Sequence, residues 1–232
     1  MHRQNRMDAP AVLFDVDGTL VDSNYVHVHA WVRAFAAEDV PVEAWRIHRS
    51  IGMDGDTLLQ TLAGDESDEV RRRLKERHSL FHREASGLLR PLPGARELLH
   101  HLAHDGAQVV LATSAPEDEL AILRDVLDCD DVVTAVTSSA DVDTAKPEPD
   151  IIAVALDRVG ATADRAVFIG DAVWDMQACV RAGLRCIGVR SGGVGDELLE
   201  AGAESVFDNA QDLLDHLAST PISTLTGSTQ RV

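Results

Sequence analysis

The stretch FDVDGTLVDSN, Phe14 to Asn24, decides the fold, because an apolar run ends there in two aspartates that stand one residue apart. The run AVLFD (11–15) is short, apolar throughout and bounded by turn residues, which predicts a buried strand. Asp15 and Asp17 would then lie at the carboxyl end of that strand, and Gly18 permits a tight turn that returns the chain. Sites in doubly wound sheets form at this edge, so the question is whether the two aspartates work as a pair.

Further segments have the same character as the first strand. Five apolar runs predict strands, at 108–113, 131–138, 166–171, 185–190 and in a short SVF around Val206. Helical patterns lie between them, at 94–106, 117–127, 149–160 and 175–183. Strand and helix therefore alternate from residue 108 onward. This alternation predicts an α/β fold with a Rossmann-like, doubly wound parallel sheet.

One long segment interrupts the alternation. Residues 23–89 contain four helical patterns and no convincing strand, so we expect an all-helical cap inserted after the first strand. Residues 1–22 and 90–218 would form the core, with a short flexible segment before the first strand. The Ser- and Thr-rich stretch 219–232 lacks periodicity, which predicts a disordered tail.

Composition excludes several classes of partner. The formal net charge of −18 disfavours nucleic acid and anionic membrane surfaces, and no apolar run is long enough to span a bilayer. The three cysteines lack CxxC spacing, which predicts free thiols and a cytoplasmic location. We expect a monomer or a homodimer whose partner is a small metabolite.

Polar residues follow the ends of several predicted strands. A single strand-end aspartate often only caps the next helix, but several polar groups on one sheet edge are harder to explain in that way. The candidates are Asp15, Asp17, Thr113, Ser114, Lys146, Asp171 and Asp175.

The chemistry of these residues is mutually consistent. Clustered carboxylates repel one another unless a cation offsets their charge, and oxygen ligands beside a phosphate suit Mg²⁺. The metal and Lys146 would keep Asp15 ionised and attract a phosphate dianion in spite of the negative net charge. Thr113 Oγ and N–H groups near Ser114 could bind phosphoryl oxygens. A carboxylate in line with phosphorus can act as a nucleophile, with Asp17 as its acid or base.

Four motifs support this interpretation. DVDGTLVDS, TS, KPEPD and GDAVWD match, in order, those of the haloacid dehalogenase superfamily, and the helical insert resembles the C1 cap of its subfamily I. Members of that subfamily resemble phosphoglycolate phosphatases and β-phosphoglucomutases. The resemblance implies a Mg²⁺-dependent phosphatase that acts on a small phosphorylated metabolite, similar to phosphoglycolate or a sugar phosphate, through an aspartyl-phosphate.

The resemblance also implies a role for each motif residue. Asp15 would be the nucleophile and Asp17 the general acid and base. Thr113, Ser114 and Lys146 would bind the phosphoryl group. The metal would be held by Asp15, the Asp17 carbonyl and Asp171, and Asp175 would be either a ligand through water or a partner of Lys146.

The same residues distinguish phosphatase activity from related activities. A dehalogenase lacks the second aspartate of the first motif, so Asp17 argues against that reaction. A β-phosphoglucomutase remains the main alternative because His27 matches a histidine of that family. The mutase, however, has a cap arginine near the position of Gly55 and Glu-Asp where this chain has Gly170 and Asp171. A third possibility is an inactive member that only binds a partner, which the complete set of catalytic side chains disfavours.

The cap offers a second set of candidates. Asn24, His27 and Trp31 fall on one helical face that could look into the site. We expect Asn24, His27, Arg49 and Met53 to select the substrate. Most of the other histidines, His78 and His82 among them, are expected on the surface.

Overall fold

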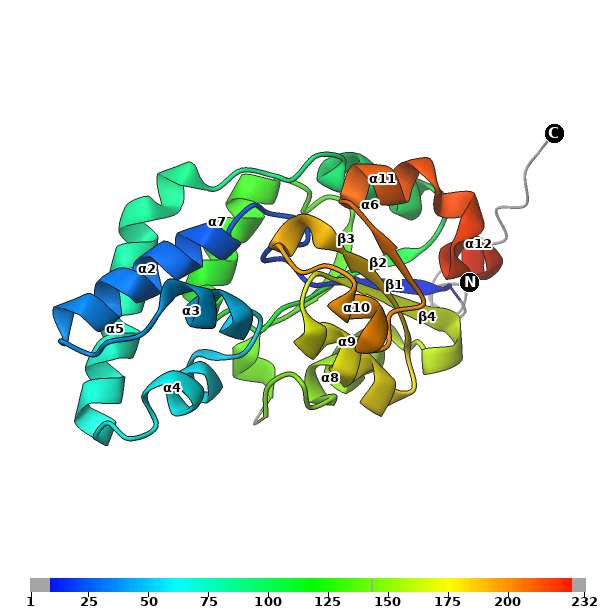
Figure 1. The fold of residues 1–232 in the computed structure, drawn as a ribbon. Coiled ribbons are helices and arrows are strands. Elements are labelled where there is room, and N and C mark those ends of the chain that lie inside the picture. The colour runs from blue at the N-terminus through cyan, green and yellow to red at the C-terminus, as the bar shows by residue number, and fades with distance from the viewer. Residues whose placement is uncertain (1–8, 143, 227–232) are drawn as a thin grey trace.

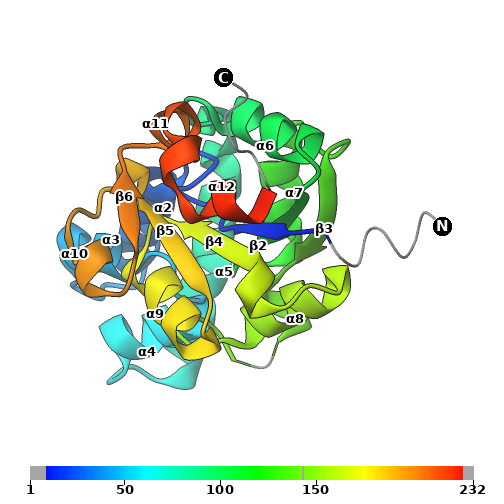
Figure 2. The same cartoon turned by 90° about the vertical axis from the view of Figure 1, so that its right-hand side faces the viewer.

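Six parallel strands form the sheet of the computed structural model, which describes residues 9–142 and 144–226 (Figures 1 and 2). Their order is β3-β2-β1-β4-β5-β6, so the chain winds outward in both directions from β1. All six predicted strands are present, and the α/β Rossmann-like class is confirmed. The strands are β1 (Ala11–Phe14), β2 (Gln108–Ala112), β3 (Val133–Thr137), β4 (Ala166–Gly170), β5 (Arg185–Val189) and β6 (Ser205–Phe207).

Helices cover both faces of the sheet because its strands are apolar on both sides. Val12 and Phe14 belong to one buried cluster and Leu13 to the other, as expected when successive side chains point to opposite faces. Figure 2 shows the two helical layers. One layer contains α6 (Ala95–His104), α7 (Glu117–Leu127), α11 (Ala210–Asp215) and α12 (Pro221–Thr226), and the other contains α8 (Asp150–Val159), α9 (Val173–Ala182) and α10 (Glu197–Glu200).

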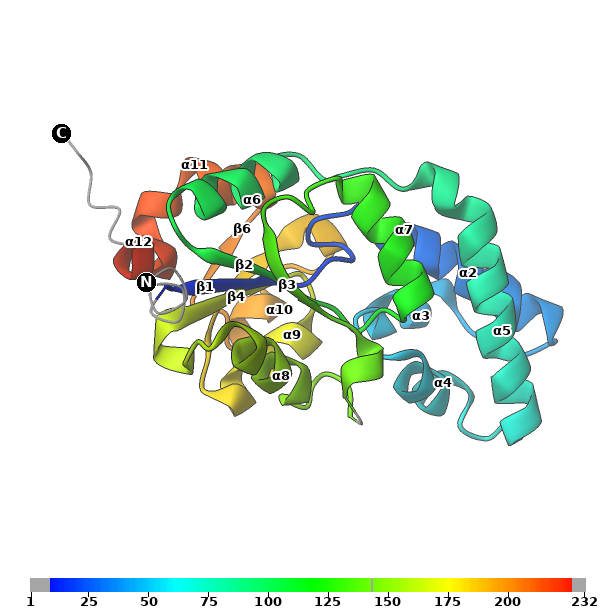
Figure 3. The same ribbon diagram turned by 180° about the vertical axis from the view of Figure 1, so that it is seen from behind.

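The cap lies between β1 and β2 in sequence and beyond the carboxyl ends of the strands in space (Figures 1 and 3). Its helices are α2 (Asn24–Ala37), α3 (Ala44–Ser50), α4 (Gly55–Ala63) and α5 (Asp68–Ala85). Trp31, Phe35 and Leu74 belong to a separate buried cluster of its own, in which α2 packs along α5. The cap therefore buries its own apolar side chains and can present a polar face to the core.

The C-terminal segment differs from the sequence prediction. Residues 221–226 form α12, and Ile222 is buried in the same cluster as the β1 side chains Val12 and Phe14. Disorder is therefore the wrong prediction for this part of 219–232, because one apolar side chain anchors a Ser- and Thr-rich helix. The rest of the predicted tail (227–232) and most of the predicted flexible N-terminal segment (1–8) lie outside the described residues.

The state of the cysteines and the hydropathy of the helices bear on the predictions made from composition. Cys129, Cys179 and Cys186 are all free, as predicted, and the structure shows that all three are buried. Within 9–142 and 144–226, no helix is both long enough and apolar enough to cross a bilayer.

Candidate active site

The site begins at the carboxyl ends of three adjacent strands. Asp15 follows β1, Thr113 follows β2 and Asp171 follows β4, and β1 lies between the other two strands. The sheet order therefore brings together side chains that are far apart in sequence, as parallel strands do at a topological switch point.

Lys146 joins this group from the loop before α8. Its Nζ lies 2.7 Å from Asp15 Oδ1 and 2.7 Å from Asp175 Oδ1, and it donates to the Ala112 carbonyl at 3.2 Å. All three charged side chains are almost fully buried. Asp175 Oδ2 also accepts from the backbone N–H of Ala172, so the structure gives Asp175 the role of partner to Lys146.

The turn after β1 places Asp17 beside the cap. Gly18 has a φ of 72°, and its N–H donates to the Val21 carbonyl at 2.9 Å, which folds the chain back. Asp17 Oδ1 accepts from Ser23 Oγ at 2.6 Å and lies 3.2 Å from His27 Nε2. The Ser23 hydroxyl therefore holds Asp17.

The electrostatics of Asp15 and Asp17 differ. Burial raises the pKa of Asp15 to about 7, since the attraction of Lys146 offsets burial and the repulsion of neighbouring carboxylates only in part. Burial also acts to raise the pKa of Asp17, but His27 and Ser23 outweigh it and hold that pKa below its ordinary value. For His27, burial lowers the pKa, and the Asp17 carboxylate raises it by more, so the net shift is upward. The two shifts favour an ionised carboxylate on Asp17 beside a protonated imidazole on His27.

Carboxylates that could hold a metal lie next to Asp15. Asp15, Asp171 and Asp175 each offer an oxygen within 4.8 Å of the others. Burial, followed by the repulsion of Asp15 and Asp175, raises the pKa of Asp171 well above its ordinary value. A divalent cation would remove that repulsion, so this donor set fits a hard metal ion with oxygen ligands. Asp15 and Asp171 follow the adjacent strands β1 and β4 directly, whereas Asp175 lies on α9 and pairs with Lys146 through Oδ1.

Asn24 orients the candidate metal ligand rather than the substrate. Its Nδ2 donates to Asp171 Oδ2 at 2.8 Å, while Thr19 Oγ1 donates to Asp171 Oδ1 at 2.9 Å. Asn24 also donates to the Gly192 carbonyl at 3.3 Å. The predicted substrate-selecting role of Asn24 is therefore not the one that its contacts favour.

A cavity of about 110 Å³ lies between core and cap. The core lines it with Asp15, Asp17, Thr113, Ser114, Ala115, Pro116 and Glu119, and the cap lines it with His27, Trp31, Ile51, Gly52, Met53, Gly55, Leu58, Lys75, His78 and Ser79. A larger hollow, which Lys146 lines, shares Gly55, Lys75, Ser114 and Pro116 with this cavity. The predicted face of His27 and Trp31 does look into the site, and Met53 reaches it as well.

Arg49 does not reach this cavity. Its guanidinium is exposed and lies 3.4 Å from Glu197 Oε1 on α10. The prediction that Arg49 selects the substrate is wrong for this conformation, because α3 directs its side chain toward α10 instead.

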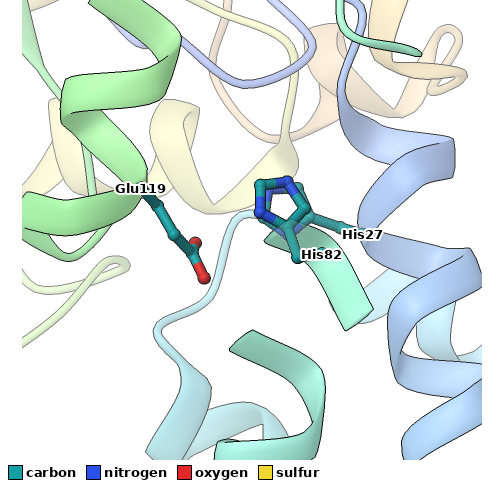
Figure 4. Close-up of side chains that lie close together, drawn as sticks. All are labelled: His27, His82 and Glu119. Atoms are coloured by element: carbon teal, nitrogen blue, oxygen red, sulfur yellow. The ribbon is translucent and has the colours of Figure 1, made fainter. Parts of the chain in front are cut away.

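Two histidines that were expected on the surface are buried beside His27. His78 Nε2 lies 3.2 Å from His27 Nδ1, and the His82 ring stacks on the His27 ring with 4.1 Å between centroids. Neither nitrogen of His82 has a hydrogen-bond partner. Figure 4 shows Glu119 of α7 directed toward His27 and His82.

A sequence signal for this cluster exists, because His78 and His82 are four residues apart on α5 and therefore share a face. The sequence pattern does not show that this face of α5 packs against α2 and α7. Glu119 carried no signal beyond its place in an acidic first turn.

The fold and the site together define a class of α/β proteins with a paired-aspartate loop after the first strand and a helical cap above it. The family model described as haloacid dehalogenase-like hydrolase matches residues 12–189, so the chain belongs to that family and is one of its hydrolases.

Similar proteins match most of the chain. It is 29% identical over 218 residues to a phosphoglycolate phosphatase of Rhodospirillum rubrum, a match that covers 89% of this chain and 90% of the relative. It is 30% identical over 197 residues to a phosphorylated carbohydrates phosphatase of Thermotoga maritima, a match that covers 83% of this chain and 91% of the relative. The crystal structure of a hydrolase from Pseudomonas syringae matches with a TM-score of 0.87 and 39% sequence identity. The match covers 90% of this chain and 98% of the hydrolase.

Proposed function

We propose that the protein is a Mg²⁺-dependent phosphatase that hydrolyses a small phosphorylated metabolite through an aspartyl-phosphate. The observation that carries the proposal is the cavity onto which Asp15 and Asp17 both open, beside Thr113 and Ser114. The names of the phosphoglycolate and phosphorylated-carbohydrate phosphatases among the relatives support the same substrate class. We also propose that the protein acts in the cytoplasm, where its free cysteines would stay reduced.

In the first step, a carboxylate oxygen of Asp15 attacks phosphorus as the bond from phosphorus to the leaving oxygen breaks. The leaving oxygen takes a proton from Asp17. His27 Nε2, 3.2 Å from Asp17, can supply that proton to Asp17, because the Asp17 carboxylate outweighs burial, raises the pKa of the imidazole and so favours its protonated form. Lys146, Thr113 and N–H groups near Ser114 hold the phosphoryl oxygens.

In the second step, water attacks phosphorus and the bond from phosphorus to Asp15 breaks. Asp17 takes the proton of the water, so the Asp15 carboxylate and inorganic phosphate are formed. The ion pair from Lys146 to Asp15 favours the carboxylate as a leaving group in this step.

Asp15, the Asp17 carbonyl and Asp171 would hold the metal. When bound, Mg²⁺ supplies positive charge that keeps Asp15 ionised and neutralises the phosphoryl oxygens. Thr19 and Asn24 would keep Asp171 oriented toward it.

The test is hydrolysis of an aryl phosphate with Mg²⁺ by the wild type, Asp15→Asn and Asp17→Asn. We expect activity in the wild type, none in Asp15→Asn, and a loss of about 100-fold or more in Asp17→Asn. Rapid acid quenching should trap a phosphoenzyme in the wild type and in Asp17→Asn. A wild type as inert as Asp15→Asn would refute the enzyme hypothesis and leave a binding protein.

A β-phosphoglucomutase is the second candidate, since His27 contacts Asp17 as the family resemblance implies. A mutase must hold a second phosphate, yet the lining of the cavity includes one lysine and no arginine among the described residues. Incubation with β-glucose 1-phosphate and a bisphosphate activator separates the two: glucose 6-phosphate indicates a mutase, and free phosphate a phosphatase.

A further inference from the structure

Glu119 is a buried carboxylate that the mechanism above does not use. It lines the cavity from the first turn of α7 and is 6% exposed. Its nearest ion-pair partner is His78 Nδ1, at 3.9 Å from Oε1, which is too far for a hydrogen bond. Its side chain does not cap α7. A buried carboxylate in this state lacks the partners that such groups normally have.

Glu119 lines the same cavity as Asp15 and Asp17, so it borders the space available to a leaving group. Figure 4 shows it directed toward the rings of His27 and His82, which lie on the cap side of the site. Burial raises the pKa of Glu119 above its ordinary value, and the positive charge of His27 opposes that shift. A hydrogen-bond donor on a ligand would stabilise the Glu119 carboxylate.

The cations of the cavity are already engaged. His27 contacts Asp17 through Nε2 and His78 through Nδ1. The Lys75 ammonium is half exposed and lies 2.7 Å from Asp56 Oδ2. Among the described lining residues, His27 and Lys75 therefore already have partners, which a carboxylate on the leaving group would have to displace.

Neutral polar groups are available instead. Ser79 and Ser114 line the same cavity as Glu119, and a serine hydroxyl can both donate and accept hydrogen bonds. The cavity of about 110 Å³ is small, which favours a small leaving group such as a polyol or an amino alcohol.

A metal ion is a weaker explanation of the same cluster. His27, His82 and Glu119 offer donor atoms within 4.8 Å of one another. However, the rings of His27 and His82 are nearly parallel, 9° apart and stacked, so their in-plane lone pairs do not converge on one point. Both nitrogens of His27 are also engaged. Tetrahedral zinc coordination would require a different arrangement of both rings.

We propose that Glu119 selects the leaving group by accepting a hydrogen bond from its hydroxyl or ammonium group and by repelling a carboxylate. The preferred substrates would be phosphate monoesters of small polyols or amino alcohols, and phosphoglycolate would be a poor substrate. This inference rests on the proposed phosphatase function and narrows it, because it favours the sugar-phosphate-like class.

The experiment compares kcat/KM for glycerol 2-phosphate, phosphoethanolamine, phosphoglycolate and an aryl phosphate in the wild type, Glu119→Gln and Glu117→Gln. Glu117 is the matched control, since it is exposed in the same turn of α7. We expect the wild type to prefer glycerol 2-phosphate or phosphoethanolamine to phosphoglycolate by about 10- to 100-fold. Glu119→Gln should lower that ratio about tenfold or more, whereas Glu117→Gln should leave it unchanged.

Glycerol 2-phosphate and phosphoethanolamine differ in the hydrogen-bond donor on the leaving group, which is a neutral hydroxyl in the first and a charged ammonium in the second. A hydroxyl can still bond to the amide of Glu119→Gln, so activity on glycerol 2-phosphate should fall less than activity on phosphoethanolamine, which loses its opposite charge. A wild type that prefers phosphoglycolate, or a ratio that Glu119→Gln leaves unchanged, would overturn the inference.

The aryl phosphate distinguishes the failure of this inference from that of the proposed function. If the wild type hydrolyses the aryl phosphate but shows no preference, only the role of Glu119 is refuted. If it hydrolyses none of the esters, the phosphatase proposal itself fails. Should Glu119→Gln not fold, inhibition of the wild type by glycerol, ethanolamine and glycolate decides the matter, because glycolate should be the weakest inhibitor.

Discussion

Lys146 is the residue on which the charge balance of the site depends. It is 1% exposed and lies between Asp15 and Asp175, so it compensates two buried carboxylates at once. Removing one partner of a buried ion pair leaves the remaining charge without compensation, which costs more than the loss of an exposed pair.

We therefore expect Lys146→Met to lower the free energy of unfolding by about 3 kcal/mol at pH 7 in the absence of metal. Lys75→Met is the matched control, because the pair of Lys75 with Asp56 is exposed and should contribute about 1 kcal/mol or less. Urea denaturation of both variants measures the difference. Equal effects of the two substitutions would show that burial of the Lys146 pairs has no energetic consequence.

Gly192 is the residue that leaves room for Asp171. A Cβ at this position would overlap Asp171 Oδ2, so any side chain there requires Asp171 to move. Gly195 in the same loop has only a flexible side-chain atom of Glu197 nearby, at 3.3 Å.

The expected result of Gly192→Ala is an Mg²⁺ requirement raised about 10- to 100-fold, because Asp171 must move away from its present position. Titration of aryl phosphatase activity with Mg²⁺ measures this, with Gly195→Ala as the control. An unchanged Mg²⁺ midpoint in Gly192→Ala would argue against Asp171 as a metal ligand.

At the scale of elements, α5 brings buried histidines against α2 and α7. Burial, followed by the charge of His27, lowers the pKa of His82 from 6.5 to about 4. Below pH 6.5 the unfolded chain takes up a proton at His82 that the folded protein does not take up until about pH 4. Stability must therefore fall as the pH falls from 6.5 to about 4.

His82→Phe should remove this loss while keeping a ring to stack on His27. The gain relative to the wild type should grow to about 3 kcal/mol as the pH falls from 6.5 to about 4. Denaturation at a series of pH values measures it, with the exposed His29 of α2 replaced by Phe as the control. Parallel pH profiles for His82→Phe and the wild type would contradict the prediction.

The elements also show which features a sequence can reveal. The six strands could be predicted because each is a short apolar run, and most of the candidate site because Asp15, Thr113 and Asp171 directly follow strand ends on one edge of the sheet. The histidines of α5 could not be placed, since the buried face of a helix depends on the neighbours against which it packs. The contact of Arg49 and the folding of α12 were not predicted for the same reason. Arg49 contacts α10, and α12 packs against β1 side chains of the core, and both partners are distant in sequence.

At the scale of the whole molecule, core and cap complete one site. The core contributes Asp15 and the candidate metal ligands, and the cap contributes His27, which holds Asp17, and Asn24, which holds Asp171. The core has two buried apolar clusters and the cap has one of its own. The cap can therefore move relative to the core without exposing any of these clusters. Substrate entry and exclusion of water both become possible through such movement.

Metal binding should also control the stability of the whole molecule. Burial raises the pKa of Asp15 from 3.8 to about 7, so between these values the folded protein holds a proton that the unfolded chain has released. The metal-free protein should therefore lose stability from this group as the pH rises from 3.8 to about 7. Mg²⁺ bound only by the folded state offsets that loss, by about 2.7 kcal/mol at a concentration of 100 times its Kd.

The measurement is the melting temperature with saturating Mg²⁺ and with a chelator, at pH 5 and pH 7.5. We expect Mg²⁺ to stabilise the wild type more at pH 7.5, where the protons that compete for Asp15 are scarce. Asp171→Asn should abolish the stabilisation, whereas the exposed control Asp164→Asn should keep it. If Mg²⁺ stabilised Asp171→Asn as much as the wild type, the metal would have to bind elsewhere, and the carboxylate cluster at the end of β1 would need another explanation.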